Sequence, residues 1–206
     1  MKKNMLVRDL MESGGISEYL IREFTHAHSF PLVMDLVYKK RNIQVSLDYE
    51  DVEICFSTAK YIENYSLSMI KPKRFTKSFW SRLTRFLFNS TLYARSGIFM
   101  IETSSHFNDR ELSLIAEFYS EFSERYLQDA DFFVGIGIKV NPNLKNSVSF
   151  HSLSFYPKSA KLCQSCYQKV AKFIIREGEE HYQACERCSH TEKPAKRKRR
   201  VSQRRR

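Results

Sequence analysis

Hydrophobic residues recur at helical and at strand-like intervals along most of the chain, and the two kinds of interval predict a mixed fold. Residues 1–40 show helical spacing in two pieces that a glycine pair separates. Residues 43–49 and 52–56 instead alternate apolar with polar side chains on either side of an acidic turn. That alternation predicts a β-hairpin.

Two later segments have the three- and four-residue spacing of amphipathic helices. Residues 76–95 gather most of their large apolar side chains on one side and carry Arg82 and Arg85 elsewhere on the circumference. The next segment begins at Asn108, whose side chain can cap a helix while Glu111 completes a capping box. Apolar residues then continue at helical spacing for several turns, so we expect a long helix there.

Three segments are strand candidates. Residues 98–103, 132–140 and 147–156 are short apolar or alternating runs, and a turn-rich Asn-Pro-Asn sequence separates the last two. The hydrophobic phase of the third run changes near His151-Ser152, which predicts a β-bulge. Together with the helices, these runs predict the α+β fold class, with a compact body of helices and antiparallel strands over residues 1–158.

Four of the five cysteines form two Cys-x-x-Cys pairs near one end of the chain. Cys163 and Cys166 make the first pair, and Cys185 and Cys188 make the second after eighteen intervening residues. Two residues between cysteines let both sulfur atoms face one ion, and two such pairs complete a closed tetrahedral zinc site. The spacing therefore predicts a zinc-finger module over residues 159–190 that binds one structural Zn2+. Reduced cysteines without a metal are the alternative.

Other residues of this module refine the prediction. We expect a short helix between the cysteine pairs, from Tyr167 to Arg176, with Gly178 ending it. His181 and His190 could each replace a cysteine as ligand, but a lone histidine near a zinc knuckle is more often a surface residue. Four thiolates remain the favoured set, and an odd number of cysteines in this arrangement fits metal binding better than a disulfide framework.

Positive charge is concentrated at the end of the chain. The net charge is +11, but residues 193–206 hold nine Lys and Arg and no acid, so the other 25 basic residues face 23 acidic ones. We expect residues 191–206 to form a disordered basic tail that resembles a nuclear-import signal and equally suits phosphate backbones. A merely solvated terminus is the alternative. The candidate nucleic-acid-binding residues of the tail are Lys196, Arg197, Lys198, Arg199, Arg200, Arg204, Arg205 and Arg206.

Ser202 is a candidate regulatory site in this tail. It lies two residues after an arginine pair, an arrangement that basic-directed kinases favour. A phosphate there would add about −1.5 to −2 charges and weaken the attraction of the tail for RNA or an import receptor. Any serine among arginines has this appearance, so the use of Ser202 stays open.

A second basic stretch, residues 64–101, contains no acid and interleaves basic with aromatic residues. Basic side chains can hold phosphates while exposed aromatic rings stack on bases. Aromatic residues at helical spacing belong more often to a core, so both interpretations stay open. The candidate nucleic-acid-binding residues are Lys71, Lys73, Arg74, Lys77, Arg82 and Arg85.

Catalytic motifs are missing from the sequence. It has no P-loop, nucleophile elbow or zincin helix, and Gly135-Ile136-Gly137 lacks the third glycine of a dinucleotide site. His26 and His28 have no evident partner, so we expect a protein that is not an enzyme. A secretory signal and an apolar run of about 18 residues are also missing, which predicts a soluble, unsecreted protein without membrane association.

A compact body, cysteines at 163, 166, 185 and 188, and an arginine-rich end together resemble the small basic, cysteine-rich accessory proteins of plant RNA viruses, in particular the silencing suppressors of the crinivirus group. The resemblance covers residues 163–206. It implies binding of double-stranded RNA, interference with host RNA silencing and some nuclear localisation.

Two functions fit these patterns. The first is a regulatory protein that binds nucleic acid, most simply RNA, and acts as a viral suppressor of host RNA silencing in the nucleus and cytoplasm of the host cell. Its expected partners are RNA, a nuclear-import receptor and host regulatory proteins. The alternative is a zinc-stabilised adaptor for protein–protein interactions, whose basic tail serves only as a nuclear-import signal.

Overall fold

The computed structural model describes residues 3–12, 16–57, 59–126, 133–164, 166, 169–177 and 180–189. Contacts divide the chain into two compact units, Met1–Ser159 and Ala160–Arg206. The first unit is a mixed body of helices and strands, and the second carries the four paired cysteines.

A five-stranded sheet forms the centre of the first unit. The elements of this unit are α1 (Lys3–Glu12), α2 (Glu18–His26), α3 (Phe30–Val37), β1 (Ile43–Val45), α4 (Tyr49–Ser57), β2 (Tyr61–Ile70), α5 (Lys77–Thr91), β3 (Ser96–Thr103), α6 (Asp109–Tyr126), β4 (Phe133–Val140), the 3-10 turn η1 (Pro142–Leu144) and β5 (Ser147–Tyr156). The strand order is β1-β4-β3-β5-β2. Only β3 and β4 run parallel, and the other neighbours are antiparallel.

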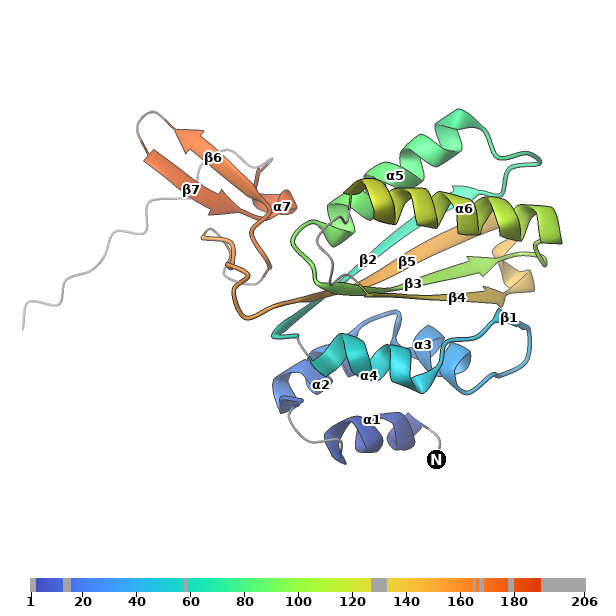
Figure 1. Ribbon diagram of the computed structural model, residues 1–206, viewed down its shortest axis with the longest axis horizontal. Helices are drawn as coiled ribbons and strands as arrows, with labels where there is room; N and C mark the ends of the chain where they lie inside the picture. The colour runs from blue at the N-terminus through green and yellow to red at the C-terminus, as the bar shows by residue number, and fades with distance from the viewer. Residues whose placement is uncertain are drawn as a thin grey trace, which may run out of the picture. The chain divides into compact units, whose positions relative to one another are not determined.

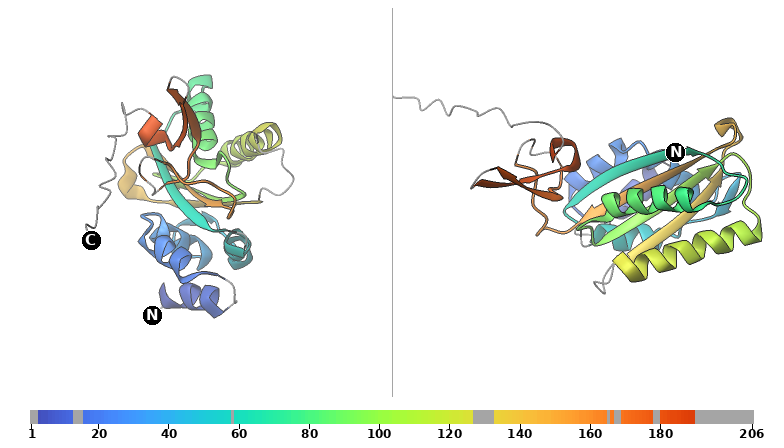
Figure 2. Two further views of the ribbon diagram at one scale, coloured as in Figure 1. Left: turned by 90° about the vertical axis from the view of Figure 1, so that its left-hand side faces the viewer. Right: turned by 90° about the horizontal axis from the view of Figure 1, so that it is seen from above.

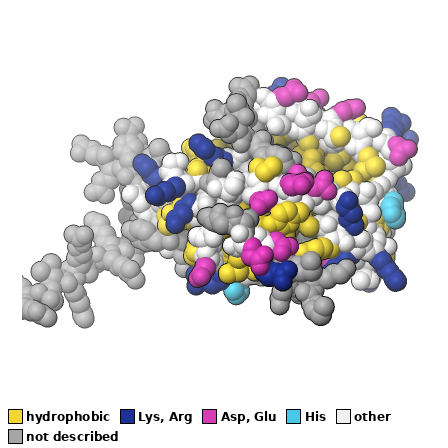
Figure 3. All heavy atoms as spheres, turned by 60° about the horizontal axis from the view of Figure 1, so that its bottom comes forward, with side chains coloured by type: hydrophobic (Ala, Val, Ile, Leu, Met, Phe, Trp, Pro, Cys, Tyr) yellow, Lys and Arg dark blue, Asp and Glu magenta, His cyan; other side chains and the backbone are white. Residues whose placement is uncertain are grey.

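Helices cover both faces of this sheet. Helices α1 to α4 form a layer on one face, and α5 and α6 lie together on the other (Figures 1 and 2). In β3, Ile98 and Met100 join the core under α1 to α4, whereas Phe99 and Ile101 join the core under α5 and α6. A strand that is buried on both faces reads as a continuous apolar run, as this one does. The layer of α1 to α4 comes forward in Figure 3, where acidic and hydrophobic side chains gather near its middle.

The predicted β-hairpin over residues 43–56 is wrong. Only Ile43–Val45 is a strand, and it pairs with β4 rather than with the residues that follow. Residues 49–57 form α4, which buries Val52 and Cys55 but leaves Ile54 47% exposed. Burial therefore follows a helical spacing, which the alternating apolar residues of this segment had concealed.

Two glycines of β4 allow the helical layer to approach the sheet. A Cβ atom on Gly137 would lie 2.7 Å from Cδ1 of Leu36, and one on Gly135 would lie 3.1 Å from Cδ2 of Leu47. Both leucines are fully buried. The Gly-x-Gly sequence thus makes room for α3 and for the segment before α4.

The predicted β-bulge in β5 is also wrong. This strand pairs with β2 and β3 in unbroken register from Ser147 to Tyr156. Ser152 and Ser154 are fully buried, and their hydroxyl groups lie 3.0 Å apart in a hydrogen bond. These two buried serines meet each other's hydrogen-bonding needs. Their polar side chains interrupt the hydrophobic pattern of the sequence, but the pairing register of the strand does not change.

The two amphipathic helices predicted from the sequence are present as α5 and α6. Thr76 caps α5, because its hydroxyl accepts a hydrogen bond from the Phe79 amide. Asn108 and Glu111 form a reciprocal capping box at α6, with both amide-to-side-chain distances at 2.9 Å. Across the described parts of the chain, no helix combines the length and the apolar character needed to cross a membrane.

Strand β2 had no counterpart among the predicted elements. It runs from Tyr61 to Ile70 and pairs along its whole length with β5. The alternation of Tyr65, Leu67 and Met69 with serines was a period-two signal that could have identified this strand.

Candidate metal centre and nucleic-acid interface

The second unit is built on an antiparallel hairpin followed by one helical turn. Its elements are β6 (Phe173–Glu177), β7 (Glu180–Ala184) and α7 (Glu186–Ser189). The predicted helix from Tyr167 to Arg176 is wrong, because its second half is strand β6. The run Phe173-Ile174-Ile175 is rich in aromatic and β-branched residues, which favour a strand. Tyr167 and Gly178 lie outside the described residues.

Backbone hydrogen bonds tie the first cysteine pair to this hairpin. The Gln164 amide donates to the Gln183 carbonyl at 2.8 Å, and the Lys172 amide donates to the Ala184 carbonyl at 2.8 Å. The Cys163 amide also donates to the Lys169 carbonyl at 2.8 Å. The end of β7 is thereby held beside the first cysteine pair, so the second pair comes next to it.

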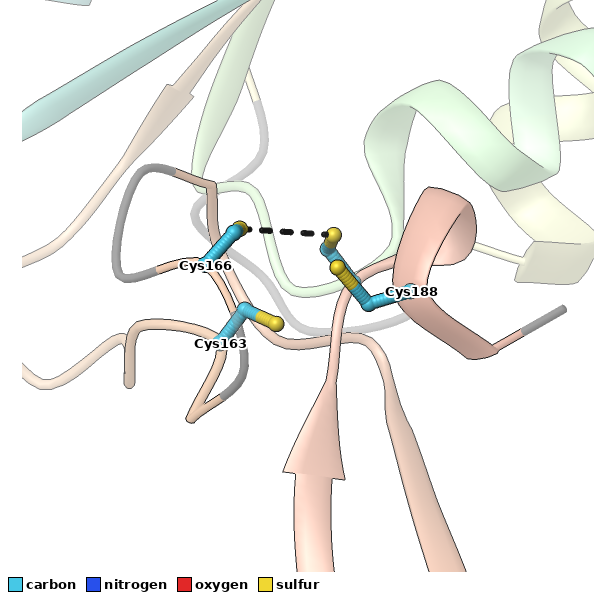
Figure 4. Close-up of side chains that lie close together, drawn as sticks. Cys163, Cys166 and Cys188 are labelled. Carbon is cyan, nitrogen blue, oxygen red and sulfur yellow. Dashed lines mark hydrogen bonds between the residues drawn. The ribbon is translucent and has the colours of Figure 1, made fainter. Parts of the chain in front are cut away.

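All four sulfur atoms converge. The Sγ atoms of Cys163, Cys166, Cys185 and Cys188 lie within 4.8 Å of one another. Those of Cys166 and Cys185 are 3.9 Å apart (Figure 4). A tetrahedral ion with metal–sulfur bonds of about 2.3 Å holds its ligands about 3.8 Å apart, whereas a disulfide needs about 2.05 Å. The four cysteines thus have the spacing of metal ligands and could bind a metal ion such as zinc.

Burial and crowding affect the protonation of the cluster. Cys163 and Cys185 are buried, and Cys166 and Cys188 are half-buried. Burial and hydrogen bonds to the neighbouring thiols raise the pKa of Cys188 to about 12, and burial raises the pKa of Cys185. The cluster by itself therefore favours protonated thiols, and a bound divalent ion would reverse that preference.

The core of the second unit is very small. Its buried cluster consists of Cys163, Ala184 and Cys185, with Cys166 and Cys188 packed against it. A core of this size contributes little to folding, and natural modules of this kind rely on a metal or disulfides. The described cysteines are all free thiols, so a metal is the staple that fits.

Several residues to which the sequence analysis gave a candidate role lie outside the described part of the chain. They are His190, Ser202 and the tail residues Lys196, Arg197, Lys198, Arg199, Arg200, Arg204, Arg205 and Arg206. The side chain of His181 is likewise not described.

Five residues of the second basic stretch are exposed. Lys73 and Arg74 lie in the loop before α5, and Lys77, Arg82 and Arg85 lie on the helix itself. At 100° per residue, Arg85 lies opposite the buried apolar residues of α5, with Lys77 and Arg82 roughly 80° and 60° to either side of it. We call these five residues the basic face.

Lys71 differs from the basic face because its ammonium group is engaged in contacts within the protein. Its ammonium donates to the Ser105 hydroxyl at 2.9 Å and lies 4.5 Å from the centre of the Phe107 ring. Because these contacts anchor the end of β2 to the segment before α6, Lys71 serves the fold.

Three aromatic residues of the same stretch belong to the core. Trp80 stacks on Phe118 of α6, with ring centres 4.7 Å apart, and packs against Phe75 and Phe79. These rings join α5 to α6 and are not presented to bases. By contrast, Phe88 of α5 is 41% exposed, and Tyr93, after the end of the helix, is 62% exposed.

Comparison with known proteins assigns no family. No family model and no curated protein matches the sequence. Two FtsZ structures from M. jannaschii are similar at TM-scores of 0.48 and 0.47, with 12% and 13% identity over 78% and 84% of this chain. The chain spans about half of those proteins, 47% and 50% of their lengths. TubZ from Bacillus thuringiensis serovar israelensis gives a TM-score of 0.34 at 12% identity, covering 75% of this chain and 42% of TubZ.

Proposed function

We propose that this protein is an RNA-binding regulatory protein that holds the phosphate backbone on the basic face and the basic tail. The observation that carries the proposal is the basic face, where five exposed cations occur in a stretch without acidic residues. Within the described residues, none of the five forms a salt bridge, although ion pairs occur elsewhere in the same unit. Their charge is therefore available to an external anion.

The dimensions of the basic face suit a nucleic-acid backbone. From Lys77 to Arg85 the helix rises about 12 Å, enough to meet more than one phosphate. Phe75, Phe79 and Trp80 are occupied in the core, and Phe88 and Tyr93 are the exposed rings near this face, so recognition rests mainly on charge and shape. Binding of this kind depends little on sequence and strongly on salt.

The metal centre has a structural role in this proposal, and we assign zinc as the metal. Four thiolates around one ion leave no open position for a substrate, as in structural zinc sites. The zinc ion holds the second unit folded at the point where the basic tail begins. The tail would then follow a folded anchor and act in RNA binding and in nuclear import.

Suppression of RNA silencing, in the nucleus and cytoplasm of a host cell, completes the proposal. It is supported by the resemblance of residues 163–206 to crinivirus suppressors. Sequestration of double-stranded RNA requires backbone recognition without base readout, which is the kind of contact that the basic face offers.

Electrophoretic mobility shifts with single-stranded RNA, double-stranded RNA and DNA test the RNA-binding role. The test variant replaces Lys77, Arg82 and Arg85 with Gln, which keeps helix propensity and removes three charges. If each residue meets one phosphate, the plot of log affinity against log salt should flatten by roughly 2 to 3.

A matched control removes the same charge elsewhere in the same unit. Arg41, Lys60 and Lys158 are exposed and lie outside the basic face, so their replacement by Gln should change the slope little. Equal effects of the two triple variants would show a response to net charge alone and would contradict the assigned surface. Deletion of residues 193–206 measures the share of the tail.

Elemental analysis of protein purified without chelator tests the metal assignment. We expect one zinc per chain and its loss in Cys163→Ser, with Cys55→Ser as the control because Cys55 is buried in the body. A zinc content near zero or near two in the wild type would contradict a single four-cysteine site.

A protein-binding adaptor is the second candidate, and the outer side of α6 favours it. Glu117, Glu121 and Glu124 are exposed there at helical spacing and form an acidic stripe. Such a stripe suits a basic protein partner. Unchanged RNA affinity after both the tail deletion and the replacement of the basic face would favour this function.

A further inference from the structure

A row of polar side chains crosses the sheet on the side of α1 to α4. Ser66 of β2 pairs in register with His151 of β5, and Glu102 of β3 lies on the next strand. These three residues are far apart in the sequence and match no motif, so only the sheet brings them together.

The distances in this row are those of a nucleophile, a base and an orienting acid. Ser66 Oγ lies 2.9 Å from Nδ1 of His151, and Nε2 of the same ring lies 3.6 Å from Oε2 of Glu102. The second distance exceeds a normal hydrogen bond, so the carboxylate acts on the ring through its charge. The side chains of His151 and Glu102 are only 12% and 19% exposed, which strengthens that interaction.

The Asn141 amide donates to Oε1 of Glu102 at 3.4 Å, which leaves Oε2 to face His151. Lys139 lies 3.8 Å from Oε1 of Glu102 but only 2.8 Å from Asp35. The adjacent His151 ring, followed by the charge of Lys139, holds the pKa of Glu102 below its usual range, so this carboxyl is ionised at neutral pH.

The contacts at both ends of the row are consistent with a Ser66 hydroxyl that donates its proton to Nδ1 of His151. A carboxylate beside Nε2 of His151 favours a proton on that nitrogen, which leaves Nδ1 to accept from the Ser66 hydroxyl. At the other end, the Asn64 amide donates to Nδ1 of His28 at 2.7 Å, so His28 carries its proton on Nε2 and donates it to Ser66 Oγ. Burial, and then His151, lower the pKa of His28, which keeps this ring neutral at pH 7.

We propose that Ser66 is an activated nucleophile, with His151 as its general base and Glu102 as the residue that orients the base, and that the protein hydrolyses accessible carboxylic esters. Ser66 is exposed, so the reacting oxygen can be reached from solvent. The site lies on a strand face with no surrounding motif for a particular acid or alcohol. Small or flexible esters are therefore the substrate class it would take.

The reaction balances with water as the only co-reactant. Ser66 Oγ attacks the ester carbonyl while its proton passes to Nδ1 of His151. The N–H group of His28 donates to the same Ser66 oxygen. The carbon–oxygen bond to the alcohol then breaks, and the alcohol leaves with the proton from His151. Water attacks the acyl–serine with His151 again as base, which releases the carboxylic acid and restores the Ser66 hydroxyl.

The test uses the full chain, a fluorophosphonate probe and p-nitrophenyl acetate. Mass spectrometry should locate the phosphonyl group on Ser66, and Ser66→Ala should remove both labelling and ester hydrolysis above the background rate. Ser68→Ala is the matched control, because Ser68 is also exposed on β2 but bonds to the Ser149 hydroxyl rather than to a histidine. This control should retain both reactions.

The base is tested separately from the nucleophile. His151→Gln should slow labelling of Ser66 by at least about 100-fold, as expected for loss of a general base, and Glu102→Gln should slow it less. If His151→Gln does not fold, His151→Asn provides a second variant with the same expected loss. Absence of labelling in the wild type, labelling at other serines, or a rate that does not depend on His151 would overturn the proposal.

Discussion

Replacement of Gly137 by Ala gives a direct test of how the helical layer meets the sheet. The added methyl group would lie 2.7 Å from Cδ1 and 3.0 Å from Cδ2 of Leu36, and 3.1 Å from Cγ of Leu47. The contact below 3.0 Å is with Leu36, which is fully buried and cannot move away without disturbing other packing. Overpacking of this kind costs about 1 to 3 kcal/mol. Removal of glycine from a strand interior returns roughly 0.5 to 1 kcal/mol, so a net loss of about 1 to 2 kcal/mol is expected.

Gly135→Ala is the matched control in the same strand. Its added methyl group would lie 3.1 Å from the end of the Leu47 side chain and 3.4 Å from Cβ of Asp51. A shift of a few tenths of an ångström at the flexible tip relieves this contact. The strain and the entropic gain should nearly cancel, which leaves the free energy of unfolding within about 0.5 kcal/mol of the wild type.

Fluorescence of Trp80 during thermal and urea denaturation measures both variants. Trp80 is the only tryptophan and packs in the body, so its emission reports on this unit. Gly137→Ala should lower Tm by roughly 2 to 8 °C. Combining it with Leu36→Ala should cost less than the sum of the single changes by about 1 kcal/mol or more, because the clash disappears. An unchanged Tm for Gly137→Ala, or a larger loss for Gly135→Ala, would refute this account of the packing.

Four further outcomes are expected. Asn108→Ala should cost about 1 kcal/mol in urea denaturation by removing half of the capping box, whereas replacement of the exposed Ser113 should cost much less. Trp80→Ala should lower stability by up to roughly 3 to 5 kcal/mol, and an RNA-dependent change in Trp80 emission without loss of folding would contradict its place in the core. Chelation of the proposed zinc ion should abolish the amide chemical-shift dispersion of residues 160–189 and leave the unfolding transition of the body unchanged, and a shifted body transition would show that the two units are coupled. The pKa of His28 is lowered in the folded state, so the stability it contributes is full above about pH 6.5 and is lost as pH falls through its folded pKa; His28→Gln should remove this step from a plot of Tm against pH.

Features set by near neighbours in the chain could be predicted from the sequence. The capping box of Asn108 and Glu111 and the amphipathic pattern of α5 depend on contacts within one or two turns, so the residue types and their spacing are sufficient evidence. The paired cysteines are similar, because two intervening residues fix the separation of the sulfur atoms within each pair. Only the meeting of the two pairs needed the hairpin between them.

Features set by partners far along the chain were decided by the tertiary structure. Residues 49–57 alternate like a strand, yet they form α4 because the glycines of β4 leave space for a helical layer above them. Trp80 could equally have stacked on a base, until Phe118 from another helix proved to cover its ring. The contact of Ser66 with His151 spans 85 positions of the sequence and exists only because β2 and β5 pair in one register. Local spacing determines which elements can form, and the burial of their surfaces against distant elements decides which of them do form and which side chains meet.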